Sequence, residues 1–504
     1  MATYEDNTPS LNQKVKRGTF WAFISHGSNS VLSLVTTVVL ARLLSPKDFG
    51  VVAIAMVVWE FVRLFGNVGV AAKLIHQQGD VDRYASAAFW LNILVAFCLA
   101  MLTVLISPFA ARFYNSELVR PMIILLALGF LVNSFGSVHS TLLNKALDFK
   151  KRSVIEVVVN SITNIITIIM AFAGYGVWSL VIPRVLCSPI QVFAFWSVCP
   201  WRPNLEFNLS HWKEIFGYGK YILGANLLRY VNINGDYMVI GKLLGSYELG
   251  LYTFAYHLAN WPVKNIVYIV NGVAFPAFST LQNDVNRMKE VFLKITRLLS
   301  LVSFPLLIGL LAVSNELIPV VYGEKWNRSI IPLQIIIGFA LLISFNSLAG
   351  QVVLAVGKPN IDFKFNAIQV PLLLVAILIG VSYGIVGVAV GMSVVVGLLG
   401  LIFLKISIGL INLNLGNVLR SLSPALISSL LMLVSVLVLR YILINFGYKS
   451  YQVLLICIPC GAVVYLSALL IFFRSSLQML WSMCMDILGN PVVGFRRNHI
   501  SSTL

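Results

Sequence analysis

Charge is scarce in this chain. Only 11% of its 504 residues are charged, and 19 Asp and Glu stand against 36 Lys and Arg. Hydrophobic residues make up 59% of the sequence, and the mean hydropathy is +0.88. A soluble protein could not bury so much apolar surface. The composition therefore predicts an all-α membrane protein that crosses the bilayer many times.

Motifs for catalysis and metal binding are also missing. The six cysteines lie in or beside apolar segments, where small buried hydrophobes are expected. The sequence has no phosphate-binding glycine loop, zinc motif or nucleophile elbow. Loops are at most about 20 residues long, too short for a folded catalytic domain. These absences exclude ATP hydrolysis and give no reason to expect an enzyme. The only small ligand expected in place of a cofactor is a coupling ion, H⁺ or Na⁺.

Fourteen apolar stretches are long enough to cross a membrane as helices. They lie at 18–43, 48–75, 84–109, 118–143, 153–173, 175–199, 216–242, 247–278, 291–313, 328–355, 361–382, 384–409, 418–443 and 449–473. Lys and Arg concentrate in the N-terminus, in 144–152, in 279–297 and in the C-terminal tail, which all fall on one side. By the positive-inside rule both termini are cytoplasmic. This sorting accounts for the net charge of +17, so we expect contact with membrane lipids and not with nucleic acid.

One short sequence occurs twice. Ala-Arg-Leu-Leu-Ser-Pro-Lys-Asp-Phe-Gly at 41–50 returns as Gly-Lys-Leu-Leu-Gly-Ser-Tyr-Glu-Leu-Gly at 241–250, each in the polar break between two apolar helices. Six spans per repeat give two halves of the same orientation, which is typical of transporters. The predicted organisation is a cytoplasmic N-terminus (1–17), an N-lobe (18–200), a linker (201–215), a C-lobe (216–410), two added helices (411–473) and a cytoplasmic tail (474–504).

Charges deep in the predicted spans are few, and such charges mark function because they are costly in a bilayer. They lie on polar stripes at helical spacing in the first two helices of each half. The stripes are Ser25, Asn29, Ser33 and Thr36; Glu60, Arg63 and Asn67; Asn226, Arg229, Asn232 and Asp236; and Asn260, Lys264 and Asn271. These four helices are predicted to enclose a hydrated cavity with cationic walls.

Such a cavity suits a ligand with phosphate and hydroxyl groups. Arg63, Arg229 and Lys264 would bind phosphate oxygens. The amides available for sugar hydroxyls are those of Asn29, Asn67, Asn226 and Asn260. The carboxylates of Glu60 and Asp236 are candidates for the site of a coupling ion.

A purely structural interpretation of these charges stays open. Glu60 would then pair with Arg63 or Arg229, and Arg229 with Asp236. Arg184 lies on a helix without a polar stripe and fits a structural role and a gating role equally well.

Several motifs resemble the polysaccharide transporters of the multidrug/oligosaccharidyl-lipid/polysaccharide exporter superfamily, most closely the Wzx-type branch of colanic acid and teichuronic acid exporters. They are Gly18-Thr19-Phe20-Trp21, the 41–50 turn, Leu147-Asp148-Phe149, Gly174-Tyr175-Gly176-Val177-Trp178, Phe275-Pro276-Ala277-Phe278 and Val321-Tyr322-Gly323-Glu324-Lys325-Trp326. The resemblance covers residues 14–475. It implies a MATE-like V of two lobes, alternating access, and export of an undecaprenyl-pyrophosphate-linked oligosaccharide across the bacterial inner membrane. The cargo would be an O-antigen, exopolysaccharide or teichuronic-type repeat unit, and a polymerase and a chain-length regulator would be the protein partners.

Two rival functions stay open. An ion-coupled drug or cation antiporter of the same superfamily would favour an acidic cavity, against the Arg and Lys found here. A membrane polysaccharide polymerase or ligase would need a long outward loop with catalytic His or Arg, and no predicted outward loop qualifies. In the outward 321–326 motif, Lys325 and Trp326 are expected to anchor a helix at the membrane surface.

Overall fold

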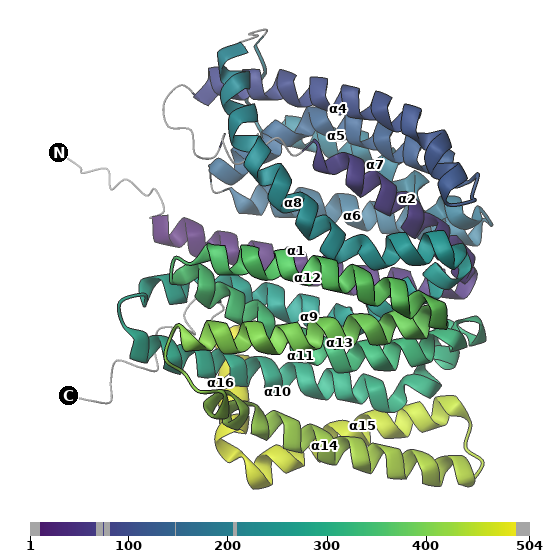
Figure 1. Cartoon of the computed structure of the whole chain (residues 1–504), viewed down its shortest axis with the longest axis vertical. Helices are drawn as coiled ribbons and strands as arrows, with labels where there is room; N and C mark the ends of the chain where they lie inside the picture. The colour runs from purple at the N-terminus through teal and green to yellow at the C-terminus, as the bar shows by residue number, and fades with distance from the viewer. Residues whose placement is uncertain (1–10, 67–73, 75–80, 147, 205–208, 490–504) are drawn as a thin grey trace, which may run out of the picture. The chain divides into compact units, whose positions relative to one another are not determined.

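The computed structural model describes residues 11–66, 74, 81–146, 148–204 and 209–489, and in these ranges the regular structure is helical (Figure 1). The predicted all-α membrane fold is confirmed, since helices satisfy their own backbone hydrogen bonds in lipid. Nine segments of the described chain are long and apolar enough to cross a bilayer. Each of the fourteen predicted ranges overlaps a helix, while fourteen as the number of membrane crossings stays a prediction.

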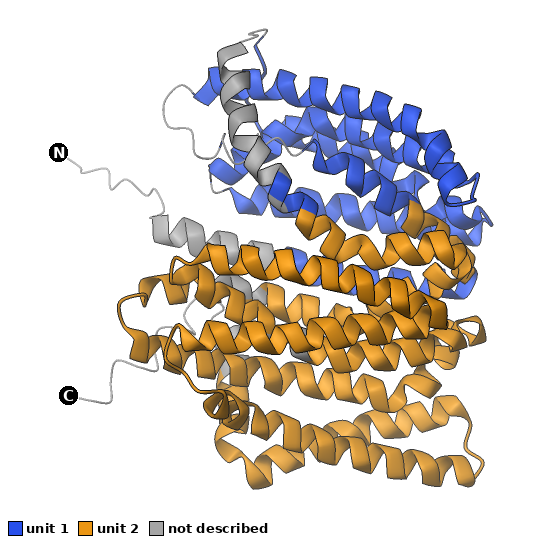
Figure 2. Cartoon of the chain, viewed as in Figure 1, with its two compact units in different colours: residues 1–43, 55–227, 485–504 blue, residues 44–54, 228–484 orange. Residues whose placement is uncertain are grey.

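The chain divides into two compact units (Figure 2). Unit 1 comprises residues 1–43, 55–227 and 485–504, and unit 2 comprises residues 44–54 and 228–484. The helices of the first half are α1 (Leu11–Leu43), α2 (Pro46–Leu64), α4 (Val81–Phe113), α5 (Val119–Lys145), α6 (Phe149–Phe172) and α7 (Ile182–Val198). α8 (Leu209–Leu243) begins in unit 1 and continues in unit 2.

Unit 1 is held together by four helix pairs: α4 with α5, α5 with α7, α1 with α6, and α6 with α7. Its aromatic core lies between α4 and the end of α7. Phe89 meets the rings of Trp196 and Trp201 edge to face, and the buried His139 stacks on Trp196 at a centroid distance of 4.5 Å. Large rings packed in this way exclude water and fix the helices against one another.

Unit 2 contains the start of α2 (46–54) and the remaining helices, except residues 485–489 of the last one. They are α9 (Gly245–Thr280), α10 (Val285–Leu317), α11 (Ile330–Ala355), α12 (Pro359–Gly380), α13 (Gly384–Gly409), α14 (Leu415–Asn445), α15 (Ser450–Phe472) and α16 (Arg474–Gly489). α11 packs on α9 and α13, and the adjacent pair α14 and α15 packs on α10 (Figure 1). A buried ion pair ties α14 to α10, with Arg440 Nε 2.6 Å from Glu316 Oε1.

Several boundaries differ from the predicted ones. The predicted 175–199 helix is a short 3₁₀ segment, Gly176–Leu180, followed by α7, which starts beside Pro183. The predicted 48–75 helix ends at Leu64 as α2, and 67–73 and 75 lie outside the described residues. The segment predicted as a tail contains α16.

Within unit 2, residues 44–50 of the first copy of the repeated turn lie against the second copy, 241–250. A side chain on Gly50 would collide with the Ser246 carbonyl, and one on Gly250 would collide with the Pro46 carbonyl. Only glycine allows two helix starts to approach so closely. In the first copy, Ser45 caps α2: Asp48 accepts from the Ser45 amide at 2.8 Å and hydroxyl at 2.7 Å, and the Asp48 amide donates back to the Ser45 hydroxyl at 3.3 Å.

Trp326 corrects one expectation. It was predicted to anchor a helix at the membrane surface, but its side chain is 0% exposed. Its ring lies 5.2 Å from that of Phe49 and 4.3 Å from that of Phe254. Trp326 therefore fills the core beside the paired turns, because its large ring buries more apolar area there than it would at the membrane surface.

Candidate functional site

In unit 1, α2 presents the predicted charges Glu60 and Arg63. Glu60 is half-buried and Arg63 is exposed. Within the described part of the chain, neither side chain forms an ion pair with the other. Arg184 lies near this end of α2, with Nη1 3.7 Å from the Met56 sulfur and its charge within electrostatic range of Glu60. An exposed arginine on an apolar helix is free to meet an anionic ligand.

Asn29, on α1, belongs to a polar contact between α1 and α6. Its Nδ2 donates to Ser25 Oγ at 3.5 Å, and its Oδ1 accepts from Asn160 Nδ2 at 3.4 Å. Asn164 donates to the Asn160 backbone oxygen at 2.7 Å. Asn67, predicted on the same grounds as Asn29, lies outside the described residues.

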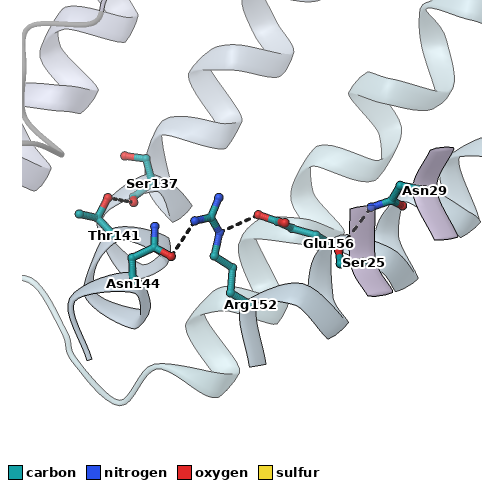
Figure 3. A network of polar contacts seen from close by, with 7 residues as sticks. All are labelled: Ser25, Asn29, Ser137, Thr141, Asn144, Arg152 and Glu156. Carbon is teal, nitrogen blue, oxygen red and sulfur yellow. Dashed lines mark hydrogen bonds and ion pairs between the residues drawn. The ribbon is translucent and has the colours of Figure 1, made fainter. Parts of the chain in front are cut away.

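A second polar stripe, missed at the level of sequence, runs along α6. It comprises Arg152, Glu156, Asn160, Thr163, Asn164 and Thr167. At its first turn Arg152 Nε lies 2.7 Å from Glu156 Oε1, and Arg152 Nη1 donates to Asn144 Oδ1 on α5 at 2.6 Å (Figure 3). The spacing of i, i+4 and i+8 is visible in the sequence, but this stripe carries its charges at the end of a helix, where a charge costs little and does not stand out.

On α8, Asp236 is a buried carboxylate, 1% exposed. It accepts from the Tyr252 hydroxyl at 2.9 Å and from the Tyr237 amide at 2.9 Å. The Tyr252 hydroxyl also lies 2.9 Å from the Met392 sulfur on α13. Arg229 does not pair with Asp236 in the described chain; it is exposed and lies within electrostatic range of Asp362 on α12. Asp236 thus sits among tyrosines, apart from the cationic side chains.

Two predicted residues on α8 and α9 differ in accessibility. Asn226 is half-buried, whereas Asn260 is buried and donates to the Tyr256 backbone oxygen at 2.9 Å. Lys264 is exposed, with its Nζ 5.9 Å from the centre of the Tyr256 ring. The exposed cations of unit 2 are thus one arginine on α8 and one lysine on α9 among the predicted site residues.

Metal coordination finds no support in the described ranges, where no group of three or more His, Cys, Asp and Glu side chains could hold an ion. The chemistry available at the predicted site is hydrogen bonding and charge attraction. Exposed guanidinium and ammonium groups attract phosphate, and amides accept and donate hydrogen bonds.

The sequence of this chain is similar to those of known proteins. The chain is 30% identical to the teichuronic acid biosynthesis protein TuaB of Bacillus subtilis (strain 168), over 71% of this chain and 75% of that protein. It is 28% identical to the lipopolysaccharide biosynthesis protein WzxC of Escherichia coli (strain K12), over 77% and 79%.

Solved structures share the fold. The lipid II flippase MurJ, in an inward closed conformation, superposes with a TM-score of 0.73 at 18% identity, covering 91% of this chain and 99% of that chain. An inward-facing multidrug resistance MATE transporter of the MOP superfamily superposes with a TM-score of 0.63 at 12% identity, covering 76% and 94%. Residues 39–331 match the family described as "Polysaccharide biosynthesis protein". The chain therefore belongs to the polysaccharide biosynthesis protein family, with the fold of the MOP superfamily that its motifs resemble.

Proposed function

We propose that this protein is a flippase that moves an undecaprenyl-pyrophosphate-linked oligosaccharide across the bacterial inner membrane by alternating access. The observation that carries the proposal is membership of a polysaccharide biosynthesis family together with exposed cations on the polar stripes of α2, α8 and α9. The cargo is an O-antigen, exopolysaccharide or teichuronic-type repeat unit. The same cations disfavour the rival drug or cation antiporter, because a cationic cargo is repelled by Arg and Lys.

The work of such a flippase is to keep a charged, hydroxylated headgroup out of hydrocarbon. Transferring polar groups from water to lipid without hydrogen bonds costs several kcal/mol per group, on the order of 2–7. Arg63 in unit 1 and Arg229 and Lys264 in unit 2 would bind the pyrophosphate. Neighbouring amides would replace the water around the sugars. No covalent bond forms or breaks, so the protein is a transporter and not an enzyme.

The setting follows from the same proposal. Both termini face the cytoplasm, where the lipid-linked unit is assembled. A polysaccharide polymerase and a chain-length regulator receive the unit at the outer face. A polymerase or ligase activity of this chain itself is disfavoured by its short loops.

The test is export by arginine variants. Arg63→Ala and Arg229→Ala should each abolish polymer export and leave the lipid-linked unit to accumulate at the inner face, because a lost charge-assisted hydrogen bond to phosphate weakens binding by about 1.5–3 kcal/mol. Polymer at the cell surface and the protein level in the membrane are both measured. Arg287→Ala is the matched control, since that side chain is 73% exposed at the start of α10. Full export by both arginine variants would refute the assignment.

A further inference from the structure

The polar stripe of α6 lies opposite the exposed apolar side of the helix. Val154, Val158, Ile165 and Ile169 lie on one side of α6 and are 41 to 60% exposed. At about 100° per residue, the polar stripe lies on the opposite side of the helix. Asn160 on that side is exposed too. An exposed amide at mid-span is tolerated only where it borders water, so α6 has one face for lipid and one for an aqueous space.

The side-chain amides beside this face can form more hydrogen bonds than they form in the structure. We call Asn29, Asn160 and Asn164 the amide ladder. Each side-chain amide has two donor hydrogens and two acceptor lone pairs. Yet the bonds between Asn160 and Asn29 and between Asn29 and Ser25 are 3.4 and 3.5 Å long, at the outer limit of hydrogen bonding. Long bonds are exchanged for bonds to a ligand at little cost.

Charge at the stripe is neutralised locally. Arg152 and Glu156 pair at 2.7 Å, with about a third of each side chain exposed, and Asn144 takes a further guanidinium hydrogen. The ladder beyond them is uncharged. A neutral row of donors and acceptors selects hydroxylated groups and not phosphate, which instead suits Arg63, Arg229 and Lys264.

Three polar positions of α6 have apolar counterparts in the second half. The turn Leu147-Asp148-Phe149-Lys150 aligns with Ile361-Asp362-Phe363-Lys364 in the second half. Continued along the helix, this alignment places Val370, Leu374 and Leu378 of α12 opposite Glu156, Asn160 and Asn164. Leu374 packs toward Gly235 of α8, 3.3 Å from the place of an added Cβ. These three positions are thus apolar in the second half, where α12 instead contacts α8 through Asn366, the counterpart of Arg152, which accepts from Asn232 Nδ2 at 3.2 Å. The amides of α6 at these positions have no counterpart in the packing of α12.

We propose that the amide ladder binds sugar hydroxyls of the saccharide headgroup, as a subsite on α1 and α6 that recognises the glycan and not the pyrophosphate. The inference rests on the proposed function. Asn160 and Asn164 are its specificity-determining residues. The Arg152–Glu156 pair keeps the end of the ladder neutral.

The test separates glycan from phosphate binding. The full chain in detergent is titrated with two probes, bare undecaprenyl pyrophosphate and lipid-linked oligosaccharide extracted from cells that lack the transporter, and binding is followed by native mass spectrometry. Asn160→Leu/Asn164→Leu copies the second half of the repeat. It should weaken binding of the oligosaccharide lipid about tenfold, from the loss of two or more hydrogen bonds, and leave binding of the bare lipid within about twofold. Asn160→Ala/Asn164→Ala, which adds no bulk, should give the same result. Val158→Leu/Ile165→Leu on the lipid face should change neither.

Equal loss for both probes in both amide variants, or no loss for either, overturns the glycan subsite. If the unsubstituted protein binds neither probe, the proposed function itself fails. If it binds both probes and the amide variants do so too, only the subsite fails.

Discussion

At the scale of single residues, Asp236 is the best-placed candidate for ion coupling. It is buried and held by the Tyr252 hydroxyl and the Tyr237 amide, and no basic side chain of the described chain pairs with it. Glu60, the other candidate, is half-buried and lies within electrostatic range of Arg184. A buried carboxylate without a counter-cation gains most from a proton or a sodium ion.

We expect Asp236→Asn to uncouple transport from its driving gradient. The amide keeps the shape of the carboxylate but carries no negative charge. It therefore neither takes up H⁺ nor attracts Na⁺ as the carboxylate does. Uptake of lipid-linked oligosaccharide into vesicles is measured with an imposed pH or sodium gradient and without one. The unsubstituted protein and Glu60→Gln should respond to one gradient, whereas Asp236→Asn should run at the gradient-free rate. An undiminished response in Asp236→Asn would leave Asp236 as a hydrogen-bond partner of Tyr252 only.

The charged residues of the candidate site were predictable because placing a charge in an apolar span costs free energy. Glu60, Arg63, Arg229 and Asp236 stand out because a charge within an apolar stretch is rare. Contacts between charged residues that are far apart in the sequence were not predictable. The ion pair of Glu316 and Arg440 joins residues 124 positions apart, and no local pattern specifies such a contact.

At the scale of elements, the close approach of α2 and α9 depends on two glycines. A methyl group at Gly250 would meet the Pro46 carbonyl, and the obstructing atoms are backbone, which cannot rotate aside. Overpacking of this kind costs typically 1–3 kcal/mol. The 41–50 turn was found in the sequence as a repeat, but its contact with its own copy was not, because pattern alone does not show which elements meet.

Gly250→Ala should therefore lower the apparent unfolding temperature of the detergent-purified protein. Gly338→Ala is the matched control: Gly338 lies within α11, and an added Cβ there meets nothing within 4 Å. Alanine favours a helix over glycine by about 0.8–1.0 kcal/mol, so the control should unfold at the same or a higher temperature. Thermal unfolding followed by tryptophan fluorescence measures both. Equal stability of the Gly250→Ala variant would show that the turns separate without cost.

Helices were the most predictable elements. Apolar length identified every one of the fourteen ranges, whereas the break before α7 and the position of Trp326 were missed. The break lies between Gly176, with a φ of +53°, and Pro183 at the start of α7, and the apolar length of the segment hid it. The position of Trp326 is set by tertiary packing, which local hydropathy does not show.

At the scale of the whole molecule, orientation is a prediction from charge alone. After the native cysteines are replaced, Glu117→Cys, in the exposed turn between α4 and α5, should react with a membrane-impermeant maleimide added to intact cells. Lys150→Cys, in the basic first turn of α6, should react only after the cells are permeabilised. Labelling in the reverse pattern would invert the topology, and with it the direction of export.

The glycine contact is reciprocal between the two copies of the turn. Gly50 meets Ser246 and Gly250 meets Pro46, and these four positions are the same two positions of the turn, taken from each copy. A contact in which residue i of one copy meets j of the other, and j meets i, is the signature of an isologous dimer interface. Two separate chains of half this length would make the same contact twice through one surface. The duplicated turn therefore has the contact pattern of an isologous interface within a single polypeptide, and a substitution in one copy alters the packing of the other.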